Sequence, residues 1–200
     1  MEQNHCDEEF FDIFRMYKTI WEMLTDRGYD INDSFLKMNM DDFKKNIKIY
    51  DNLIYQPKNG HNHLNKLCIF FCKEDNVGAK LIQQEFLPYV NENNCKQGII
   101  ILKKTITTQA KKNILENISD IRIELFTRDE LLVNITKNFL VPRFFLIEDK
   151  NFLKQYNISE SQLPRTNTND PIIRYFGFKK GQLVKTINKL DNTINYRYVV

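Results

Sequence analysis

Lysines and threonines gather in the segment LKKTITTQAKKN, residues 102–113, and their types and spacing suit phosphate binding. Two lysines follow an apolar run, and a threonine pair stands where a helix would begin. The first turn of a helix offers unpaired N–H donors and partial positive charge, and flanking lysines attract a nucleic-acid backbone without reading its sequence. The candidate phosphate contacts are Lys103, Lys104, Thr107, Thr108 and Lys111. The alternative interpretation is an ordinary solvated turn between a strand and a helix.

Two histidines and two cysteines form a possible zinc set, comprising His61, His63, Cys68 and Cys72. The segment CIFFC is apolar and strand-like, and four residues along a strand separate its two thiols by about 13 Å. A tetrahedral zinc ion holds each thiolate at about 2.3 Å. We therefore expect core cysteines beside a loop with solvated histidines, and neither a metal nor another cofactor.

Familiar catalytic motifs are missing from the sequence. It contains no G-x-x-x-x-G-K-[ST], no G-x-G-x-x-G and no G-x-S-x-G. A metal-dependent nuclease would need carboxylates that converge on a divalent ion, and the apolar strands carry none. Glu74 and Asp75, just past the first of these strands, are predicted to be turn residues. The chain is therefore expected to be non-catalytic and to bind no small-molecule substrate.

Composition describes a globular chain without a strong overall charge. Its 200 residues are 42% hydrophobic and 12% aromatic, which predicts a packed core in one large or two small domains. A net charge of +3 means that any contact with nucleic acid must be local. The acidic N-terminus has no signal-peptide pattern, the four cysteines are scattered, and no apolar run approaches the roughly 18 residues of a membrane span. These features predict an intracellular protein without membrane contacts.

Apolar periodicity predicts an α/β arrangement in the first part of the chain. Apolar residues from Phe10 to Leu24 recur every three or four positions, which indicates a helix that Asp7 caps and Gly28 ends. Strands are expected at 66–72, 97–103 and 121–126, and further helices at 40–49, 77–90 and 107–118, with Pro88 disturbing the second of these. This alternation predicts a small sheet flanked by crossover helices.

Shorter and more irregular segments follow, which predicts a domain boundary near residues 127–132. We expect an extended segment at 139–147, a helix at 148–156, and strands at 182–187 and 195–200. The chain should therefore have two abutting domains, an α/β domain of residues 1–128 and a small mixed-sheet α+β domain of residues 129–200.

Prolines and glycines punctuate the segment between residues 163 and 187. Asp170 and Pro171 suit a helix cap and the first helical position, and Gly177 can end that short apolar helix in a left-handed conformation. The sequence Lys179-Lys180-Gly181 predicts a tight turn into the next strand. The glycines lie at element ends, separated by aromatic residues, so they do not resemble a phosphate-binding loop.

The same segment resembles the C-terminal domain of the fifth subunit of eukaryotic nuclear RNA polymerases, a family that also has an archaeal form. The family pattern runs L-P-R-I, D-P-V-A-R-Y, G and R-G-Q-V-V-K-I-I-R. The matching positions here are Leu163, Pro164, Arg165, Asp170, Pro171, Arg174, Tyr175, Gly177, Lys180, Gly181, Gln182, Val184 and Lys185. We use the name assembly motif for ten of these positions. They are the matching residues from Leu163 to Gln182, with Lys180 left out.

Other segments resemble the family in the same order along the chain. DELLVNITKNFLVPRF (129–144) is similar to E-L-L-x-N-I-T-x-x-x-L-V-P, YRYVV to the family's ending, and YKTIWEMLTDRGY (17–29) to its N-terminal helix. The archaeal form has only the C-terminal domain, so the N-terminal half resembles the eukaryotic type, which also occurs in large DNA viruses. The chain departs from the family at residues 188–195, where NKLDNTIN replaces the R-P-S-E-T-A-G loop and lacks its arginine and proline.

The resemblance implies a non-catalytic subunit of a multisubunit DNA-directed RNA polymerase. Its C-terminal assembly domain would anchor on the largest subunit, beside neighbouring small subunits, and its N-terminal domain would form part of the jaw. The lysine and threonine segment would then contact phosphates of downstream duplex DNA. The expected location is the nucleus of a cell, or the host cytoplasm and virion of a large DNA virus. The alternative is a free-standing DNA-binding or adaptor protein with the same fold.

Overall fold

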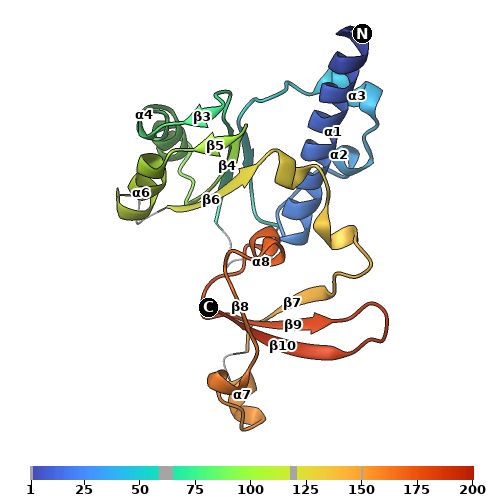
Figure 1. Ribbon diagram of the computed structural model, residues 1–200, viewed down its shortest axis with the longest axis vertical. Helices are drawn as coiled ribbons and strands as arrows, with labels where there is room; N and C mark the ends of the chain where they lie inside the picture. Colours follow the sequence, from blue (N-terminus) through green and yellow to red (C-terminus); the bar gives the residue numbers. More distant parts are fainter. Residues whose placement is uncertain (1, 59–64, 118–120, 150) are drawn as a thin grey trace. The chain divides into compact units, whose positions relative to one another are not determined.

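The chain folds into two compact units, residues 1–133 and 134–200. The computed structural model describes residues 2–58, 65–117, 121–149 and 151–200. Each unit has its own sheet and its own helices (Figure 1). The fold is therefore a two-domain α+β fold, as predicted. None of the described helices is long and apolar enough to cross a membrane.

Helix α1, Glu2–Asp26, is the main helix of the first unit. It begins before the predicted cap, so the prediction that Asp7 caps it is wrong. Its end is as predicted, because Gly28 has a φ of 90°. The Gly28 and Tyr29 N–H groups donate to the carbonyls of Thr25 and Leu24 at 3.0 and 2.9 Å, the two bonds of a Schellman motif.

The apolar stripe of α1 packs into an aromatic cluster with two short helices. These are α2, Asp33–Lys37, which the sequence did not predict, and α3, Met40–Asn46, which ends earlier than expected. Trp21 stacks on Phe35 of α2, with ring centroids 5.0 Å apart. Tyr17 meets Phe43 of α3 edge-on at 5.3 Å and stacks on Phe71 at 5.1 Å. These contacts bury the α1 side that faces the sheet.

The sheet of the first unit has the strand order β1-β2-β4-β6. Its strands are β1 (Leu53–Tyr55), β2 (Leu67–Phe71), β4 (Gln97–Leu102) and β6 (Arg122–Thr127). The last three are parallel, and β1 pairs antiparallel with β2. Every residue of β2 and β4 is buried, as their uninterrupted apolar runs predicted.

The helix predicted at 77–90 is divided by a π-helical turn. It comprises α4 (Ala79–Leu81), the π turn η1 (Ile82–Phe86) and α5 (Leu87–Glu92), with Pro88 in the first turn of α5. The Leu87 N–H donates to the Ile82 carbonyl, five residues back. The wider turn thus stands where proline removes a backbone donor from the helix.

The predicted helix after β4 is α6, Thr108–Asn117. Before α4 and α6 lie two strands of two residues each, β3 (Asn76–Val77) and β5 (Thr105–Ile106), which pair in parallel. The sequence predicted neither strand. Figure 1 shows β3, β5, α4 and α6 together on one side of the first unit.

The second unit contains the predicted mixed sheet, in the order β7-β9-β10-β8. Its strands are β7 (Arg143–Ile147), β8 (Arg165–Thr166), β9 (Leu183–Ile187) and β10 (Ile194–Val199). Only the β8–β10 pair is parallel among these described strands. Helix α8, Pro171–Phe176, covers one face of the sheet, where Ile173 forms a core with Val184 and Val199.

Short turns connect the remaining elements. The 3₁₀ turn η2 (Asp129–Leu131) lies at the end of the first unit, and the second unit contains the 3₁₀ turns η3 (Ile135–Lys137) and η4 (Glu160–Gln162) and the helix α7 (Phe152–Gln155). The helix predicted at 148–156 is therefore too long. Asp149 Oδ1 accepts from the Asn151 N–H at 2.8 Å, a local bond that competes with an earlier helix start. Of the extended segment predicted at 139–147, residues 139 and 140 form a turn, and Arg143–Ile147 is the strand β7.

Candidate functional site

The predicted phosphate contacts follow β4 and surround the start of α6. Thr107 caps the helix, because its Oγ1 accepts from the Ala110 N–H at 3.2 Å and its carbonyl accepts from the Lys111 N–H at 3.0 Å. Thr108 is then the first helical residue, and both Thr108 and Lys111 are exposed. The strand–turn–helix geometry expected for this segment is confirmed.

An aspartate lies between the two lysines that precede this helix. Lys103 Nζ lies 2.5 Å from Asp75 Oδ1, and Lys104 Nζ lies 2.5 Å from Asp75 Oδ2. Hydrogen bonds from both lysines lower the pKa of the Asp75 carboxyl to about 2. Two positive charges against one negative charge leave this triad with a net charge of +1. A phosphate that approaches the lysines must therefore compete with Asp75.

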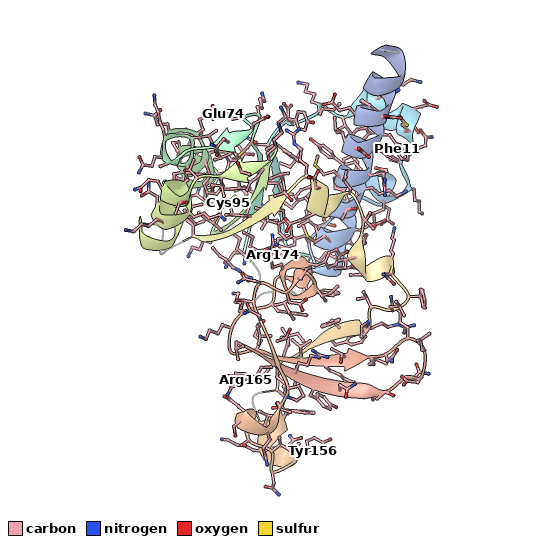
Figure 2. The ribbon with its side chains drawn as sticks, in the orientation of Figure 1. Phe11, Glu74, Cys95, Tyr156, Arg165 and Arg174 are labelled. Atoms are coloured by element: carbon pink, nitrogen blue, oxygen red, sulfur yellow. The ribbon has the colours of Figure 1, made fainter. Side chains whose placement is uncertain are left out.

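Backbone pairing brings Asp75 to the lysines. The Thr105 N–H donates to the Asp75 carbonyl at 3.0 Å, and the Thr107 N–H donates to the Val77 carbonyl at 3.0 Å. Glu74, the residue before Asp75, is labelled at this edge of the first unit in Figure 2. The sequence predicted only turn residues here, since a strand pair of two residues each has no periodic signal.

Three residues of the assembly motif build the ends of helix α8. Asp170 Oδ1 accepts from the Ile172 N–H at 2.9 Å, and Pro171 stands in the first turn. Gly177 closes the helix with a φ of 66°. The predicted cap, first-turn proline and left-handed end are all confirmed.

Two further motif residues build the turn before β9. Gly181 has a φ of 86°, and its N–H donates to the Val199 carbonyl at 2.9 Å. Gln182 Oε1 accepts from the Lys179 N–H at 2.6 Å, which closes the predicted tight turn with a side chain. Gly181 thus acts through its backbone conformation, and Gln182 acts through its side-chain amide.

Tyr175 of the motif is buried and joins two segments that are distant in sequence. Asn134 Nδ2 donates to the Tyr175 hydroxyl at 3.1 Å. Asn134 Oδ1 accepts from the N–H and the Oγ1 of Thr136 at 3.0 and 2.7 Å. Asn134 was not singled out in the sequence, although it lies in the matching N-I-T segment, because a buried amide cannot be recognised from its letter alone.

The remaining motif residues lie nearer the surface. Pro164 and Arg165 are exposed, whereas Leu163 and Arg174 are half-buried. The Pro164 carbonyl accepts from the Tyr198 N–H at 2.9 Å, and Arg165, labelled in Figure 2, pairs with Tyr198 across β8 and β10. The exposed residues of the assembly motif are therefore Pro164, Arg165, Pro171 and Gly181.

The predicted core placement of two cysteines is confirmed. Cys68 lies on β2 and Cys72 follows it, and burial raises the pKa of each thiol to about 12. Across the described residues, no group of three or more His, Cys, Asp or Glu side chains could hold a metal ion. His61 and His63 lie outside the described residues.

Comparison with known proteins agrees with the resemblance seen in the sequence. Residues 7–87 match the profile of RNA polymerase Rpb5, N-terminal domain, and residues 133–199 match RNA polymerase Rpb5, C-terminal domain. The chain is 31% identical to DNA-directed RNA polymerase subunit 5-like protein 1 of Arabidopsis thaliana, over 97% of this chain and 98% of that protein. The chain belongs to the RNA polymerase Rpb5 family.

A second relative supports this membership. DNA-directed RNA polymerases IV and V subunit 5B of Arabidopsis thaliana is 31% identical, over 91% of this chain and 87% of that protein. As an Rpb5-type chain, the protein is a subunit of a DNA-directed RNA polymerase and acts in transcription. The Rpb5 C-terminal match includes the whole assembly motif, whereas the N-terminal match ends at residue 87, before Lys103. The roles of both sets of residues therefore stay predictions.

Proposed function

We propose that this chain is a non-catalytic polymerase subunit that anchors on the largest subunit and forms part of the downstream-DNA jaw. Residues 129–200 would be the assembly domain, and residues 1–128 the jaw domain. The observation that carries the proposal is the presence of both Rpb5 domains in one chain, whose relatives align over nearly its full length. Neighbouring small subunits would be further partners. The protein would work where its polymerase works, in a nucleus or in the host cytoplasm and virion of a large DNA virus.

Charge supports the assignment of anchoring to the second unit. Residues 134–200 carry eleven Lys and Arg against five Asp and Glu, a net charge of +6. Residues 1–133 carry eighteen against twenty-one, a net charge of −3. A basic unit favours an acidic partner surface, because complementary charge speeds docking and disfavours wrong partners. The buried motif residues keep this unit folded, and exposed Pro164 and Arg165 are available for contact.

The jaw contact rests on the segment around α6. Lys103, Lys104 and Lys111 and the Thr107 cap lie on one turn and the helix that follows it. Contacts from such residues would be to phosphates and would read no sequence. Since the first unit has a negative net charge, its DNA binding would depend on this local segment.

Co-purification tests the proposal. We expect the full-length tagged chain to purify in stoichiometric amounts with the large subunits of its polymerase. A chain recovered mostly free would favour the adaptor alternative instead. The non-catalytic assignment is tested on the pure chain with magnesium and DNA: cleavage or synthesis that one internal point mutation abolishes would overturn it.

A further inference from the structure

Large apolar side chains are exposed at one end of the sheet in the second unit. Phe139, Leu140 and Leu190 are 63%, 63% and 67% exposed, and Phe145 and Ile194 are 46% and 48% exposed. We name these five residues the hairpin-end patch. Leaving several large apolar groups together in water is unfavourable, and such patches mark interaction sites.

Strand register places two members of the hairpin-end patch on one sheet face. Ile194 is directly opposite Ile187, which is opposite Arg143, and Phe145 follows Arg143 by two residues. Residues paired across strands, and residues two apart along a strand, share a face. This is the face opposite α8, since Phe144, the neighbour of Phe145, packs against the core that contains Ile173.

A lysine fixes the other three members close together. Lys189 Nζ donates to the carbonyls of Thr136 and Asn138 at 2.7 and 2.9 Å, which ties the β9–β10 turn to the segment before β7. Leu190 follows this lysine directly, and Phe139 and Leu140 follow Asn138. The Asn188 N–H also donates to the Thr193 carbonyl at 2.9 Å, so the turn itself is closed. The patch is presented by a defined structure.

Helix α7 packs on the same face of the sheet, in the row that Tyr196 shares with Lys185 and Phe145. Phe152 of α7 packs on Tyr196 of β10, with ring centroids 5.0 Å apart. Figure 1 shows α7 at the end of the second unit away from the β9–β10 turn. The five residues of the hairpin-end patch nevertheless stay 46% to 67% exposed.

We propose that the hairpin-end patch docks an apolar segment of another polymerase subunit that carries Asp or Glu beside its apolar residues. This inference rests on the proposed function. The acidic flank follows from exposed Arg143 at the patch and from the net charge of +6 on residues 134–200.

Two other occupants fit the patch less well. A second copy, docked patch to patch, would bring together two units with a net charge of +6 each. Single-stranded nucleic acid stacks its bases on aromatic rings, whereas three of the five patch residues are aliphatic. Charge and side-chain type thus favour a protein segment.

Site-specific cross-linking in the assembled polymerase tests the inference. A photoreactive amino acid replaces Leu190 in the full chain, and mass spectrometry identifies the cross-linked peptide. We expect a peptide of another polymerase subunit with large apolar residues next to Asp or Glu. Cross-links to a second copy, to nucleic acid or to no polymerase subunit would overturn the inference.

Substitutions give a second, independent readout. Phe139→Ser with Leu190→Ser should reduce the amount of polymerase retained by the tagged chain about tenfold, since a few buried apolar side chains carry most of an interface's affinity. Arg143→Glu should act in the same direction. Tyr156→Ser is the matched control. Tyr156 is 62% exposed in the same unit, but its ring packs on Phe152 of α7 and is not part of the hairpin-end patch.

The outcomes separate this inference from the proposed function. Retention of patch variants at the wild-type level would overturn the docking site and leave the proposed function intact. A wild-type chain that retains no polymerase would overturn both. Because the substituted side chains are exposed, circular dichroism of the patch variants should match wild type.

Discussion

Burial determines the behaviour of the thiols of Cys68 and Cys72. It raises their pKa to about 12, whereas an unfolded cysteine titrates near 8.5. Below about pH 8 both thiols stay protonated in the folded and in the unfolded chain. Their full contribution to the free energy of unfolding is therefore present there. As the pH rises from about 9 toward 12, the unfolded chain releases protons that the folded chain retains, so the free energy of unfolding falls.

We therefore predict that Cys68→Ser and Cys72→Ser each flatten the loss of stability at alkaline pH. Serine does not titrate in this range, so each variant removes one of the groups that favour the unfolded chain. Urea unfolding at a series of pH values between 7 and 11 measures the effect. An unchanged pH dependence in both variants would contradict the buried placement of these thiols.

Asp75 limits what Lys103 and Lys104 can contribute to DNA binding. If these lysines face DNA, Asp75→Asn should strengthen DNA binding and increase its salt slope by roughly one unit, because the carboxylate no longer competes with phosphate. Binding of a DNA duplex to the assembled polymerase, measured over a salt series, gives both quantities. Glu74→Gln is the matched control, which removes a neighbouring charge but keeps the Asp75 pairs. Equal effects of the two variants would show only a general charge effect.

Tyr175 combines a buried ring with a hydrogen bond to Asn134. Tyr175→Phe keeps the ring and removes one hydrogen bond, so it should cost about 0.5–1.5 kcal/mol, the net contribution of a typical hydrogen bond. Tyr175→Ala should cost about 3–5 kcal/mol and reduce incorporation into the polymerase far more than Thr108→Ala does. Thermal unfolding and pull-down measure the two effects. Normal assembly of Tyr175→Ala would argue against a structural role for this contact.

At the scale of elements, strands and helices with strong local signals could be predicted. The all-apolar runs of β2 and β4 and the Asp-Pro and Gly ends of α8 each carry their own signal. Strands β1, β3, β5 and β8 do not, because segments of two or three residues depend on partners elsewhere in the chain. The same limit applies to the candidate sites: Asp75 reaches the lysines through β3 and β5, and the hairpin-end patch depends on the tertiary contacts of Lys189.

The left-handed end of α8 gives a test at this scale. Gly177 has a φ of 66°, so Gly177→Ala should lower the free energy of unfolding by about 1–2 kcal/mol. Gly78→Ala is the control, since Gly78 has a φ of −90° and an added Cβ would meet nothing within 4 Å. Alanine there should cost only about 0.5 kcal/mol, the difference between glycine and alanine at a helix N-cap, and less than at Gly177. Thermal unfolding of both variants measures the two effects. Equal decreases in melting temperature would contradict the role of backbone conformation at Gly177.

At the scale of the whole molecule, charge is distributed unevenly between the two units. The overall charge of +3 combines +6 on residues 134–200 with −3 on residues 1–133. Under the proposed function, the basic unit docks on acidic protein surfaces, and the acidic unit approaches DNA through the lysines near α6. Salt should then weaken two separate contacts, and variants in each unit should separate them.

The double variant Lys103→Ala, Lys104→Ala is the sharpest test of this division. It should leave assembly intact, because anchoring is assigned to the other unit, and it should shorten the lifetime of the polymerase–DNA complex as salt rises. The salt slope should fall by roughly one unit and not two, since Asp75 already neutralises one of the two charges. The hairpin-end variant Phe139→Ser, Leu190→Ser should instead reduce the amount of the chain in the assembled polymerase. It should not change the salt slope of DNA binding in the polymerase that does assemble. Complex lifetime across a salt series, with subunit stoichiometry from the same preparations, measures both. A double lysine variant that matched wild type at every salt concentration would identify the segment as a solvated turn.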